Sequence, residues 1–231
     1  MTDNSKDEFI EITRIKEEFI ANASHELKTP IASVRLAAES ALTSLERDDG
    51  MTKSFLEQIL RDSDRMNELI SDLLDLSAME SSDVFMETFD LHDVIANEIS
   101  YLSKQNKKRI SYKKKKVEIN ANFDDISLAV KNLIKNALKY SPPEENILIQ
   151  IEENDKSVTC SFQDFGSGIS KSDQEKIFER FYRVDKGRSR KVGGTGLGLA
   201  IVKHALDRNN AVIEIVSELD HGSNFTIVFE K

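Results

Sequence analysis

Four clusters along the chain hold residue types that could do chemistry, and the first surrounds a histidine. Segment 24–30 reads Ser-His-Glu-Leu-Lys-Thr-Pro within a stretch of helical periodicity. If the flanking apolar residues face a helical seam, His25 lies off that seam, with Glu26 beside it and Thr29 one turn on. A neutral imidazole is a nucleophile, and a neighbouring carboxylate can accept its ring proton. Pro30 removes the helical bond to the Glu26 carbonyl, which loosens that turn. Single surface histidines usually have no function, so this cluster alone leaves both interpretations open.

The second cluster lies on one face of a helix that the periodicity predicts over residues 124–140. Asn132, Asn136, Lys139 and Tyr140 point within about 100° of one another at the helical turn angle. Asparagine oxygens suit Mg²⁺, which prefers oxygen ligands and keeps substrate phosphates in its shell. These groups could therefore hold a metal–triphosphate, although an ordinary solvated helix face is the alternative.

The third cluster is Asp164-Phe165-Gly166-Ser167-Gly168, at the end of a predicted strand. The alternation of apolar residues continues to Asp164, so its carboxylate should project toward the core side. A buried carboxylate needs a hydrogen-bond donor, and the exocyclic amine of adenine is one. The two glycines permit a sharp turn or a close approach to a ligand. A capped strand end followed by a turn is the alternative.

The fourth cluster is a glycine-rich segment, residues 193–198, which opens a predicted helix. Seven of the nine glycines fall within residues 166–198. Backbone N–H groups at a helix start can face an anion, but no Walker A sequence follows. Cations lie just upstream, at Arg180, Arg183, Lys186, Arg188, Arg190 and Lys191, and Ile177, Phe178 and Phe181 provide an apolar anchor. The pattern predicts a lid over a nucleotide, whereas a plain flexible loop would not explain both enrichments.

Composition excludes several classes of protein. The 231 residues include 32 Lys and Arg against 41 Asp and Glu, a net charge of −9 that argues against a dedicated DNA-binding chain. No apolar run approaches the ~18 residues that span a bilayer, and no signal peptide is recognisable, so we expect a cytoplasmic location. The single cysteine, Cys160, excludes a disulfide framework, and its place in a strand predicts a packing role.

The elements that must position these clusters fall into two regions. Residues 1–80 hold nine basic and 18 acidic side chains, whereas residues 81–231 hold 23 of each. The first region predicts an antiparallel hairpin of two long helices, with a turn at 48–52. Its predicted seam comprises Leu27, Ile31, Val34, Ala38, Ala41 and Leu45, then Phe55, Ile59, Met66, Leu69, Leu73 and Leu76, interrupted by Asp62. Because one hairpin has little core, two copies should pair into a four-helix bundle, so we predict a homodimer. Phe9, Ile12, Ile15 and Phe19 extend the first helix as a signalling helix or as a frayed end.

The second region alternates between helical and strand patterns. We expect a linker at 81–90, a basic turn or hairpin at 107–119, helices at 90–104, 124–140, 172–181 and 197–208, and strands at 146–153, 157–163, 211–217 and 223–230. This order favours an α/β sandwich with helices on one face, and an α+β class for the whole chain. The run Lys113–Lys116, with Lys107, Lys108 and Arg109, is interpreted as a solvated hairpin, with nucleic acid or anionic lipid as the alternative partner.

In order, these clusters resemble the motifs of a bacterial two-component sensor histidine kinase. The resemblance covers the chain from about residue 12 to its end, and the order of the motifs is more specific than any one of them. The matching segments are 19–30 (the phosphoacceptor box), 132–140 (the N box), 164–168 (the first glycine box), 178–183 (the F box) and 193–199 (the second glycine box). The family implies a dimerisation and phosphotransfer domain, here 1–80, and a Bergerat-type ATP-binding domain, here 81–231.

The resemblance also implies roles for individual residues. His25 would attack the γ-phosphate of ATP, Glu26 would take the proton, and Thr29 would position water when the protein dephosphorylates its regulator. The N-box roles are Mg²⁺ binding by Asn132 and Asn136, phosphate binding by Lys139 and stacking near adenine by Tyr140. Asp164 would accept from the adenine amine, and the remaining nucleotide contacts would be Gly166, Gly168, Phe178, Arg183, Gly194, Thr195, Gly196, Leu197 and Gly198.

The implied partners are a second copy of the chain and the receiver domain of a cognate response regulator, docked on the helical bundle. This segment itself should contact neither nucleic acid nor membrane, although the full protein could be membrane-anchored. The sequence departs from the family at Asn122, where Asp is frequent, and at Leu128, where Gln is frequent. A Bergerat-type ATPase is disfavoured because Asn132 stands where such enzymes carry a carboxylate. A dimeric scaffold that only binds nucleotide is the other alternative.

Overall fold

The structure is a computed structural model that describes residues 3–47, 50–184 and 194–231. For residues 3–12, 15 and 16 it describes the backbone only. The chain divides into two compact units, whose main bodies lie before and after position 72. The functional division at residues 80 and 81 stays a prediction.

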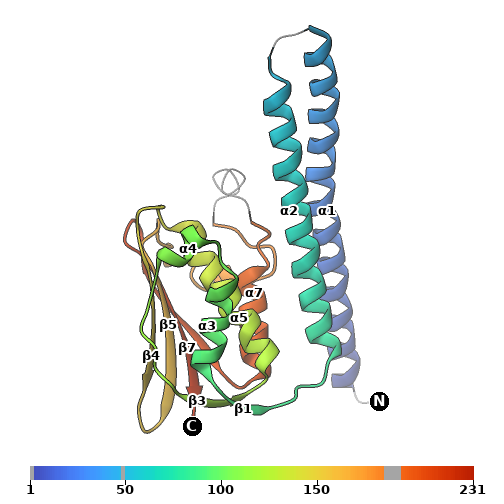
Figure 1. Cartoon of the computed structure of the whole chain (residues 1–231). Helices are drawn as coiled ribbons and strands as arrows, with labels where there is room; N and C mark the ends of the chain where they lie inside the picture. The colour runs from blue at the N-terminus through green and yellow to red at the C-terminus, as the bar shows by residue number, and fades with distance from the viewer. Residues whose placement is uncertain (1–2, 48–49, 185–193) are drawn as a thin grey trace. The chain divides into compact units, whose positions relative to one another are not determined.

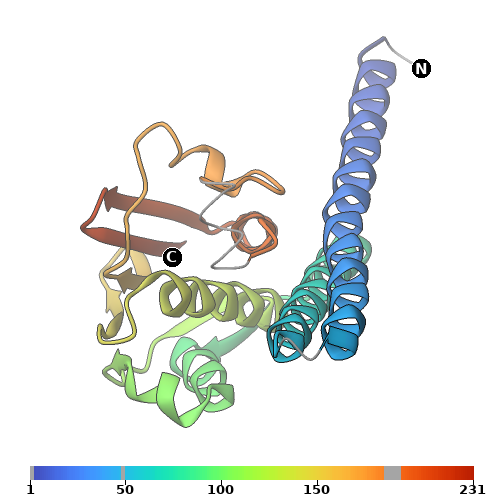
Figure 2. The ribbon, with the colours of Figure 1, turned by 90° about the horizontal axis from the view of Figure 1, so that it is seen from above.

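The first unit is built on an antiparallel pair of long helices, as predicted. Helix α1 spans Asp3–Arg47 and α2 spans Thr52–Ser81 (Figures 1 and 2). Gly50, with φ of 73°, lies in the connection, where a left-handed backbone conformation favours glycine. Because α1 runs without interruption through residues 24–30, the helix predicted around His25 is confirmed.

The seam of α1 agrees with the prediction only in part: Ala41 is buried, and Leu27, Val34 and Ala38 are half-buried. The predicted seam residues Ile31 and Leu45 are 55% and 65% exposed. The buried residues of α1 are Pro30, Ala37, Ala41 and Ser44. The prediction was wrong at Ile31 and Leu45, where the neighbouring residues Pro30 and Ser44 are buried instead.

The seam of α2 follows the prediction. Leu69 and Leu76 are buried, and the other predicted positions are half-buried. Asp62, which interrupts the apolar pattern, accepts a hydrogen bond of 2.6 Å from the Ser33 hydroxyl, and Gln58 donates to the same hydroxyl at 3.0 Å. This polar contact between the helices removes the penalty of placing a carboxylate at the seam.

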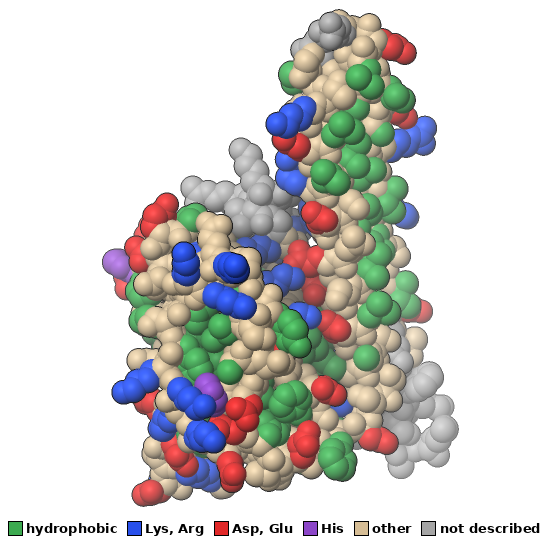
Figure 3. Space-filling view, in the orientation of Figure 1, with side chains coloured by type: hydrophobic (Ala, Val, Ile, Leu, Met, Phe, Trp, Pro, Cys, Tyr) green, Lys and Arg blue, Asp and Glu red, His purple; other side chains and the backbone are tan. Residues whose placement is uncertain are grey.

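A second apolar face remains exposed along the hairpin. Figure 3 shows hydrophobic side chains spread along both helices on the side that faces the viewer. The exposed large hydrophobic residues of the hairpin are Ile20, Ile31, Leu36, Leu42, Leu45, Met51, Leu56, Leu60, Ile70 and Leu74. A surface of this extent is typical of a contact with another protein surface.

The second unit is a mixed sheet covered by helices on one face, as predicted. Its five strands follow the order β2-β4-β5-β7-β6, with β2 parallel to β4 and the other neighbours antiparallel. The strands are β2 (Ile110–Tyr112), β4 (Ile147–Glu153), β5 (Ser157–Asp164), β6 (Val212–Glu218) and β7 (Gly222–Glu230). The covering helices are α3 (Leu91–Tyr101), α5 (Phe123–Tyr140) and α7 (Gly198–Arg208) (Figures 1 and 2). The alternation in β5 buries Cys160, as expected for a packing role.

Three segments of this unit differ from the prediction. The expected linker 81–90 contains β1 (Glu87–Asp90), which pairs with β3 (Glu118–Ala121). The expected basic hairpin 107–119 is instead the end of α4 (Lys104–Lys108) followed by β2 and the start of β3. These strands were missed because their pairing partners lie about 30 residues away in the chain.

The third difference is the expected helix at 172–181, which is only a short 3₁₀ helix, η1 (Lys176–Phe178). The Asp173 carboxylate accepts from the hydroxyls of Ser170 (2.6 Å) and Tyr182 (2.7 Å). Such side-chain bonds compete with helix formation. Phe181 has φ of 64°, a conformation that no right-handed helix contains.

Arg109 was predicted to belong to a solvated basic hairpin, and this prediction was wrong. Its guanidinium donates to the carbonyls of Leu138, Ser141, Pro142 and Glu145 at 2.8–3.3 Å. These carbonyls lie at and just beyond the C-terminus of α5, where a cation is favourable. Arg109 therefore fixes the end of the helix that carries the second sequence cluster.

Asn122 caps the start of the same helix. Its Oδ1 accepts from the Asp125 backbone N–H at 2.9 Å, and its backbone is extended, with φ of −78° and ψ of 119°. Asparagine and aspartate are about equally good at this position. The departure from the family pattern at Asn122 therefore leaves the helix start intact.

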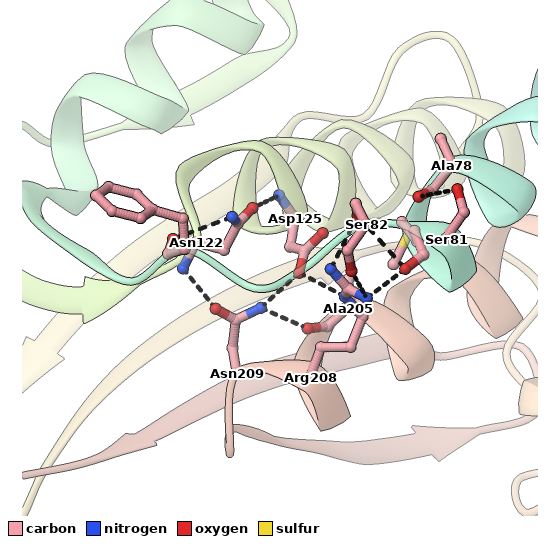
Figure 4. A network of polar contacts seen from close by, with 10 residues as sticks. Ala78, Ser81, Ser82, Asn122, Asp125, Ala205, Arg208 and Asn209 are labelled. Carbon is pink, nitrogen blue, oxygen red and sulfur yellow. Dashed lines mark hydrogen bonds and ion pairs between the residues drawn. The ribbon is translucent and has the colours of Figure 1, made fainter.

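Arg208, the last residue of α7, joins three segments of the second unit (Figure 4). Its Nε lies 3.0 Å from Oδ2 of Asp125, and the two side chains are 14% and 6% exposed. Its other nitrogens donate to the Met79 carbonyl, to the Ser82 carbonyl (3.1 Å) and to the Ser82 hydroxyl (3.1 Å). One guanidinium therefore caps the C-terminus of α2 and compensates a buried carboxylate of α5.

Asn209 extends this network to the helix cap (Figure 4). Its side-chain amide donates to Asp125 at 3.1 Å and to the Ala205 carbonyl at 2.7 Å, and its Oδ1 accepts from the Asn122 N–H at 2.6 Å. Asn122 in turn donates to the Phe85 carbonyl at 3.0 Å. The start of α5, the end of α7 and the segment after α2 are therefore held by one set of polar contacts.

We expect Arg208→Met to destabilise the second unit by about 3 kcal/mol, because Asp125 would stay buried without its cation. The matched control is Lys203→Met on the same helix, whose pair with Asp207 is about half exposed and should contribute less than ~0.5 kcal/mol. Urea unfolding followed by circular dichroism compares the two variants with the original chain. Equal effects of the two substitutions would contradict the structural role given to Arg208.

Candidate functional site

His25 lies on the exposed side of α1, as the periodicity predicts. Thr29, one turn on, is exposed as well, and its hydroxyl donates to the His25 carbonyl at 3.3 Å. Pro30 is buried within the helix and supplies no N–H to the Glu26 carbonyl. The imidazole is therefore reachable by a large substrate, and the polar groups of Glu26 and Thr29 lie next to it along the helix.

Glu26 has a partner that the sequence did not reveal. Its Oε2 lies 3.1 Å from Nη2 of Arg65, which belongs to α2. The side chains are 30% and 18% exposed, so the pair is half-buried between the helices. The carboxylate beside the histidine is therefore held in place from the opposite helix.

Asn132 is buried in α5 at 6% exposure. Its Nδ2 donates to the Leu128 carbonyl at 2.9 Å, which directs Oδ1 away from the helix's own backbone. A Cβ atom placed on Gly198 would lie 3.0 Å from that Oδ1. The first residue of α7 therefore leaves room beside a buried amide oxygen, which is a suitable ligand for a hard cation.

The other members of the second cluster extend from the same helix. Asn136 is half-buried, and Tyr140, at the helix end, is 46% exposed. The Lys139 ammonium lies 5.5 Å from the centre of the Tyr140 ring, within the range of a cation–π contact. An anionic phosphate and a flat aromatic base could both be bound by this pair.

Asp164 is buried at 5% exposure at the end of β5, as the strand alternation predicts. Its Oδ1 accepts from the backbone N–H groups of Gly166 (2.9 Å) and Ser223 (3.3 Å). Burial raises the pKa of this carboxyl, and the bonds from Gly166 and Ser223 oppose that rise only in part. A carboxyl in this state gains from a further donor, such as an exocyclic amine.

The first glycine box needs its glycines for space. A Cβ on Gly166 would overlap the Tyr140 carbonyl, and one on Gly168, where φ is 66°, would overlap the Glu218 carbonyl. The backbone therefore passes directly between the end of α5 and the end of β6. This close approach links the first glycine box to the helix of the second cluster.

The F box and the second glycine box meet through the backbone. Phe181 N–H donates to the Gly196 carbonyl at 2.8 Å. Phe178, Arg183 and Gly196 are half-buried, whereas Gly194, Thr195 and Leu197 are buried. The remaining members of these predicted motifs, Lys186, Gly187, Arg188, Arg190, Lys191 and Gly193, lie outside the described residues. The part of the lid prediction that rests on them stays a prediction.

Two family models match the chain, one in each region. Residues 15–82 match the His Kinase A (phospho-acceptor) domain, and residues 121–231 match the histidine kinase-, DNA gyrase B- and HSP90-like ATPase. The sensor-like histidine kinase SenX3 of Mycolicibacterium smegmatis is 34% identical over 97% of this chain and 59% of its own length. The phosphate regulon sensor protein PhoR of Pseudomonas aeruginosa is 35% identical over 95% of this chain and 51% of its own length. The chain belongs to the sensor histidine kinase family.

Solved structures share the fold of this histidine kinase core. The Acinetobacter baumannii histidine kinase AdeS gives a TM-score of 0.66 at 22% identity, over 89% of this chain and 97% of that one. Histidine kinase ThkA, solved in complex with response regulator protein TrrA, gives 0.74 at 19% identity, over 96% of this chain and 63% of that one. The kinase core spans about half of the length of SenX3 and PhoR, its curated relatives.

In this kinase core, α5 links the boxes of the second unit. Its middle faces Gly198 through Asn132, and its end faces Gly166 through the Tyr140 carbonyl. Ser223, which the sequence did not single out, pairs with Asp164 across β5 and β7. The alternation in β7 was visible in the sequence, but the register that brings Ser223 to Asp164 was not.

Membrane-spanning helices and clusters of acidic, histidine or cysteine metal ligands are both absent from the described residues of the kinase core. No helix among them has the length and apolar character needed to cross a membrane. No group of three or more His, Cys, Asp and Glu side chains among them could hold a metal ion.

We expect Asp164 to titrate at a higher pH than Asp173 in the free protein. Burial raises the pKa of Asp164, whereas the hydroxyls of Ser170 and Tyr182 lower the pKa of Asp173. The side-chain ¹³C chemical shifts, followed by NMR as the pH is lowered, measure both transitions, and Asp164→Asn assigns the first. The reverse order would show that Asp164 is hydrated rather than buried.

Proposed function

We propose that the chain is the catalytic core of an ATP-dependent histidine kinase that phosphorylates His25 and passes the phosphoryl group to an aspartate of a response regulator. One observation carries the proposal, which is the presence of two sites in one chain. In a phosphoacceptor-type segment, the exposed His25 stands beside Glu26, whose carboxylate pairs with Arg65. The ATPase-type domain contains the buried Asp164 and Asn132.

ATP is the proposed substrate of the second unit. Asp164 would accept from the adenine amine, because its carboxylate is buried at the end of β5 and has acceptor capacity beyond its two backbone bonds. Tyr140 would lie near the base and Lys139 near the phosphates. The other contacts proposed from the motifs are Gly166, Gly168, Phe178, Arg183, Gly194, Thr195, Gly196, Leu197 and Gly198.

Mg²⁺ is the proposed cofactor, and the residues of α5 fit it. Asn132 offers a buried amide oxygen beside a glycine, and Asn136 lies one turn on. When bound with ATP, Mg²⁺ would neutralise phosphate charge. Asn132 also replaces the carboxylate that would activate water, which favours transfer to His25 over hydrolysis.

The proposed reaction is a phosphoryl transfer to nitrogen. One ring nitrogen of His25 forms a bond to the γ-phosphorus, the bond from that phosphorus to the bridging oxygen breaks, and ADP leaves with the electron pair. The proton of the other ring nitrogen passes to the Glu26 carboxylate and then to water. A second transfer moves the phosphoryl group from His25 to a regulator aspartate, and Thr29 would position water for the later dephosphorylation of that regulator.

The proposed partners are a response regulator receiver domain and a second copy of the chain. ThkA was solved with a response regulator, which supports a similar partner here. The second apolar face of the hairpin supports self-association, because a helical pair with exposed apolar residues on a second side is suited to form a four-helix bundle.

We expect γ-labelled ATP to label the protein with a phosphoryl group that is labile in acid and stable in base, as a phosphoramidate is. His25→Ala should abolish the label, while His221→Ala, which alters an exposed histidine of the second unit, should keep it. Gel autoradiography after acid and base treatment measures both. Release of free phosphate without labelled protein would instead indicate an ATPase, and nucleotide binding without turnover would indicate a scaffold.

We expect Leu60→Glu to weaken dimerisation by at least about 100-fold, because a charge would be placed within an apolar contact. The residue is 64% exposed in the single chain. Lys53→Glu, a charge change at a highly exposed side chain of the same helix, is the control and should stay dimeric. Light scattering measures the molecular mass across a dilution series. A dimer that tolerates Leu60→Glu would show that this face is not the contact.

A further inference from the structure

Within the described part of the hairpin, the ion pair between Arg65 and Glu26 differs from the pairs that lie along a single helix. It joins α2 to α1, and Arg65 is 18% exposed. By contrast, the pair Arg35–Glu39 joins residues four apart on one helix, with side chains that are 82% and 60% exposed. Exposed pairs of that kind contribute little to stability, and a half-buried pair gains little over an apolar contact of the same size. Stability alone therefore gives no strong reason for a guanidinium at position 65.

The position of the pair suggests a different role. Glu26 is the residue next to His25, and Arg65 reaches it from the opposite helix at 3.1 Å. The guanidinium donates in a fixed plane, so it restricts both the position and the rotation of the carboxylate. A carboxylate accepts through two oxygens, so the contact at Oε2 leaves Oε1 able to accept a proton from the histidine side.

We propose that Arg65 is a positioning residue for the phosphorylation of His25: it holds the Glu26 carboxylate in the orientation that receives the imidazole proton. The inference rests on the proposed kinase function. During the transfer, the N–P bond at His25 forms, the bond from the γ-phosphorus to the bridging oxygen breaks, and the ring proton moves to Glu26. Arg65 forms no bond to substrate and acts through the carboxylate alone.

The neighbouring contacts of the hairpin indicate that Arg65 orients Glu26, while other residues hold the two helices together. One turn earlier on α2, Asp62 accepts from Ser33, and Gln58 donates to the same hydroxyl. These uncharged donors already hold the two helices together one to two turns from Arg65 along α2. The pairing of the helices therefore does not depend on Arg65, whose contact is with the carboxylate next to the phosphoacceptor.

The test measures the rate of autophosphorylation of the dimeric protein as a function of ATP concentration. Arg65→Gln should lower kcat about tenfold. A positioned acid–base group typically contributes ~100-fold or more, and this variant keeps the Glu26 carboxylate but loses the contact that orients it. The KM for ATP should not change, because Arg65 lies in the helical unit. Arg65→Lys should recover part of the rate. Arg61→Gln, which alters an exposed arginine one turn earlier on α2, is the control and should match the original chain.

The double variant Glu26→Gln/Arg65→Gln separates positioning from a structural effect. If Arg65 acts through Glu26, the double variant should have the kcat of Glu26→Gln alone. It also leaves neither charge unpaired, so it tests the proposal even where Arg65→Gln fails to fold by circular dichroism. Additive losses in the double variant, or a normal kcat in a folded Arg65→Gln, would overturn the proposal. Absence of labelled His25 in the original chain would instead overturn the kinase function itself.

Discussion

The ion pair between Asp125 and Arg208 is the constraint on which the second unit depends. Asp125 is buried in the first turn of α5, and a buried carboxylate is tolerated only with close compensation. Arg208 supplies it from the last residue of α7 and so fixes the two helices to each other at one end. At the other end of α7, Gly198 lies beside the Asn132 amide. The distance between the glycine-rich start of α7 and the amide face of α5 is therefore set by a contact about ten residues away.

Patterns that depend on neighbouring residues were predictable. The alternation along β5 gave the burial of Cys160 and Asp164, because side chains of a strand point to opposite faces in turn. Helical periodicity gave the exposure of His25 and the bounds of α5 within a residue. In both cases, one buried face determines which residues turn inward, and the information lies within a single element.

Features that depend on distant partners were not predictable. The predicted seam of α1 was wrong at Ile31 and Leu45, because apolar residues occur on neighbouring faces of this helix and only the partner helix decides between them. Strand β1 and the roles of Arg65 and Arg109 rest on contacts across 27 residues or more. A charged residue in the sequence shows that a partner is needed but not where it lies.

The hydrogen bonds at Asp62 limit how the hairpin can move. Ser33 and Asp62 meet at 2.6 Å from opposite helices, so a slide of α1 along α2 by one helical turn would separate them. A slide that brings Ala37 to the place of Ser33 leaves the half-buried carboxylate without this donor, whereas a slide in the other direction replaces the serine hydroxyl by that of Thr29. The contact therefore opposes a displacement of α1 against α2 in the direction that brings Ala37 opposite Asp62. Bending or rotation of the helical pair as a body keeps Ser33 and Asp62 together.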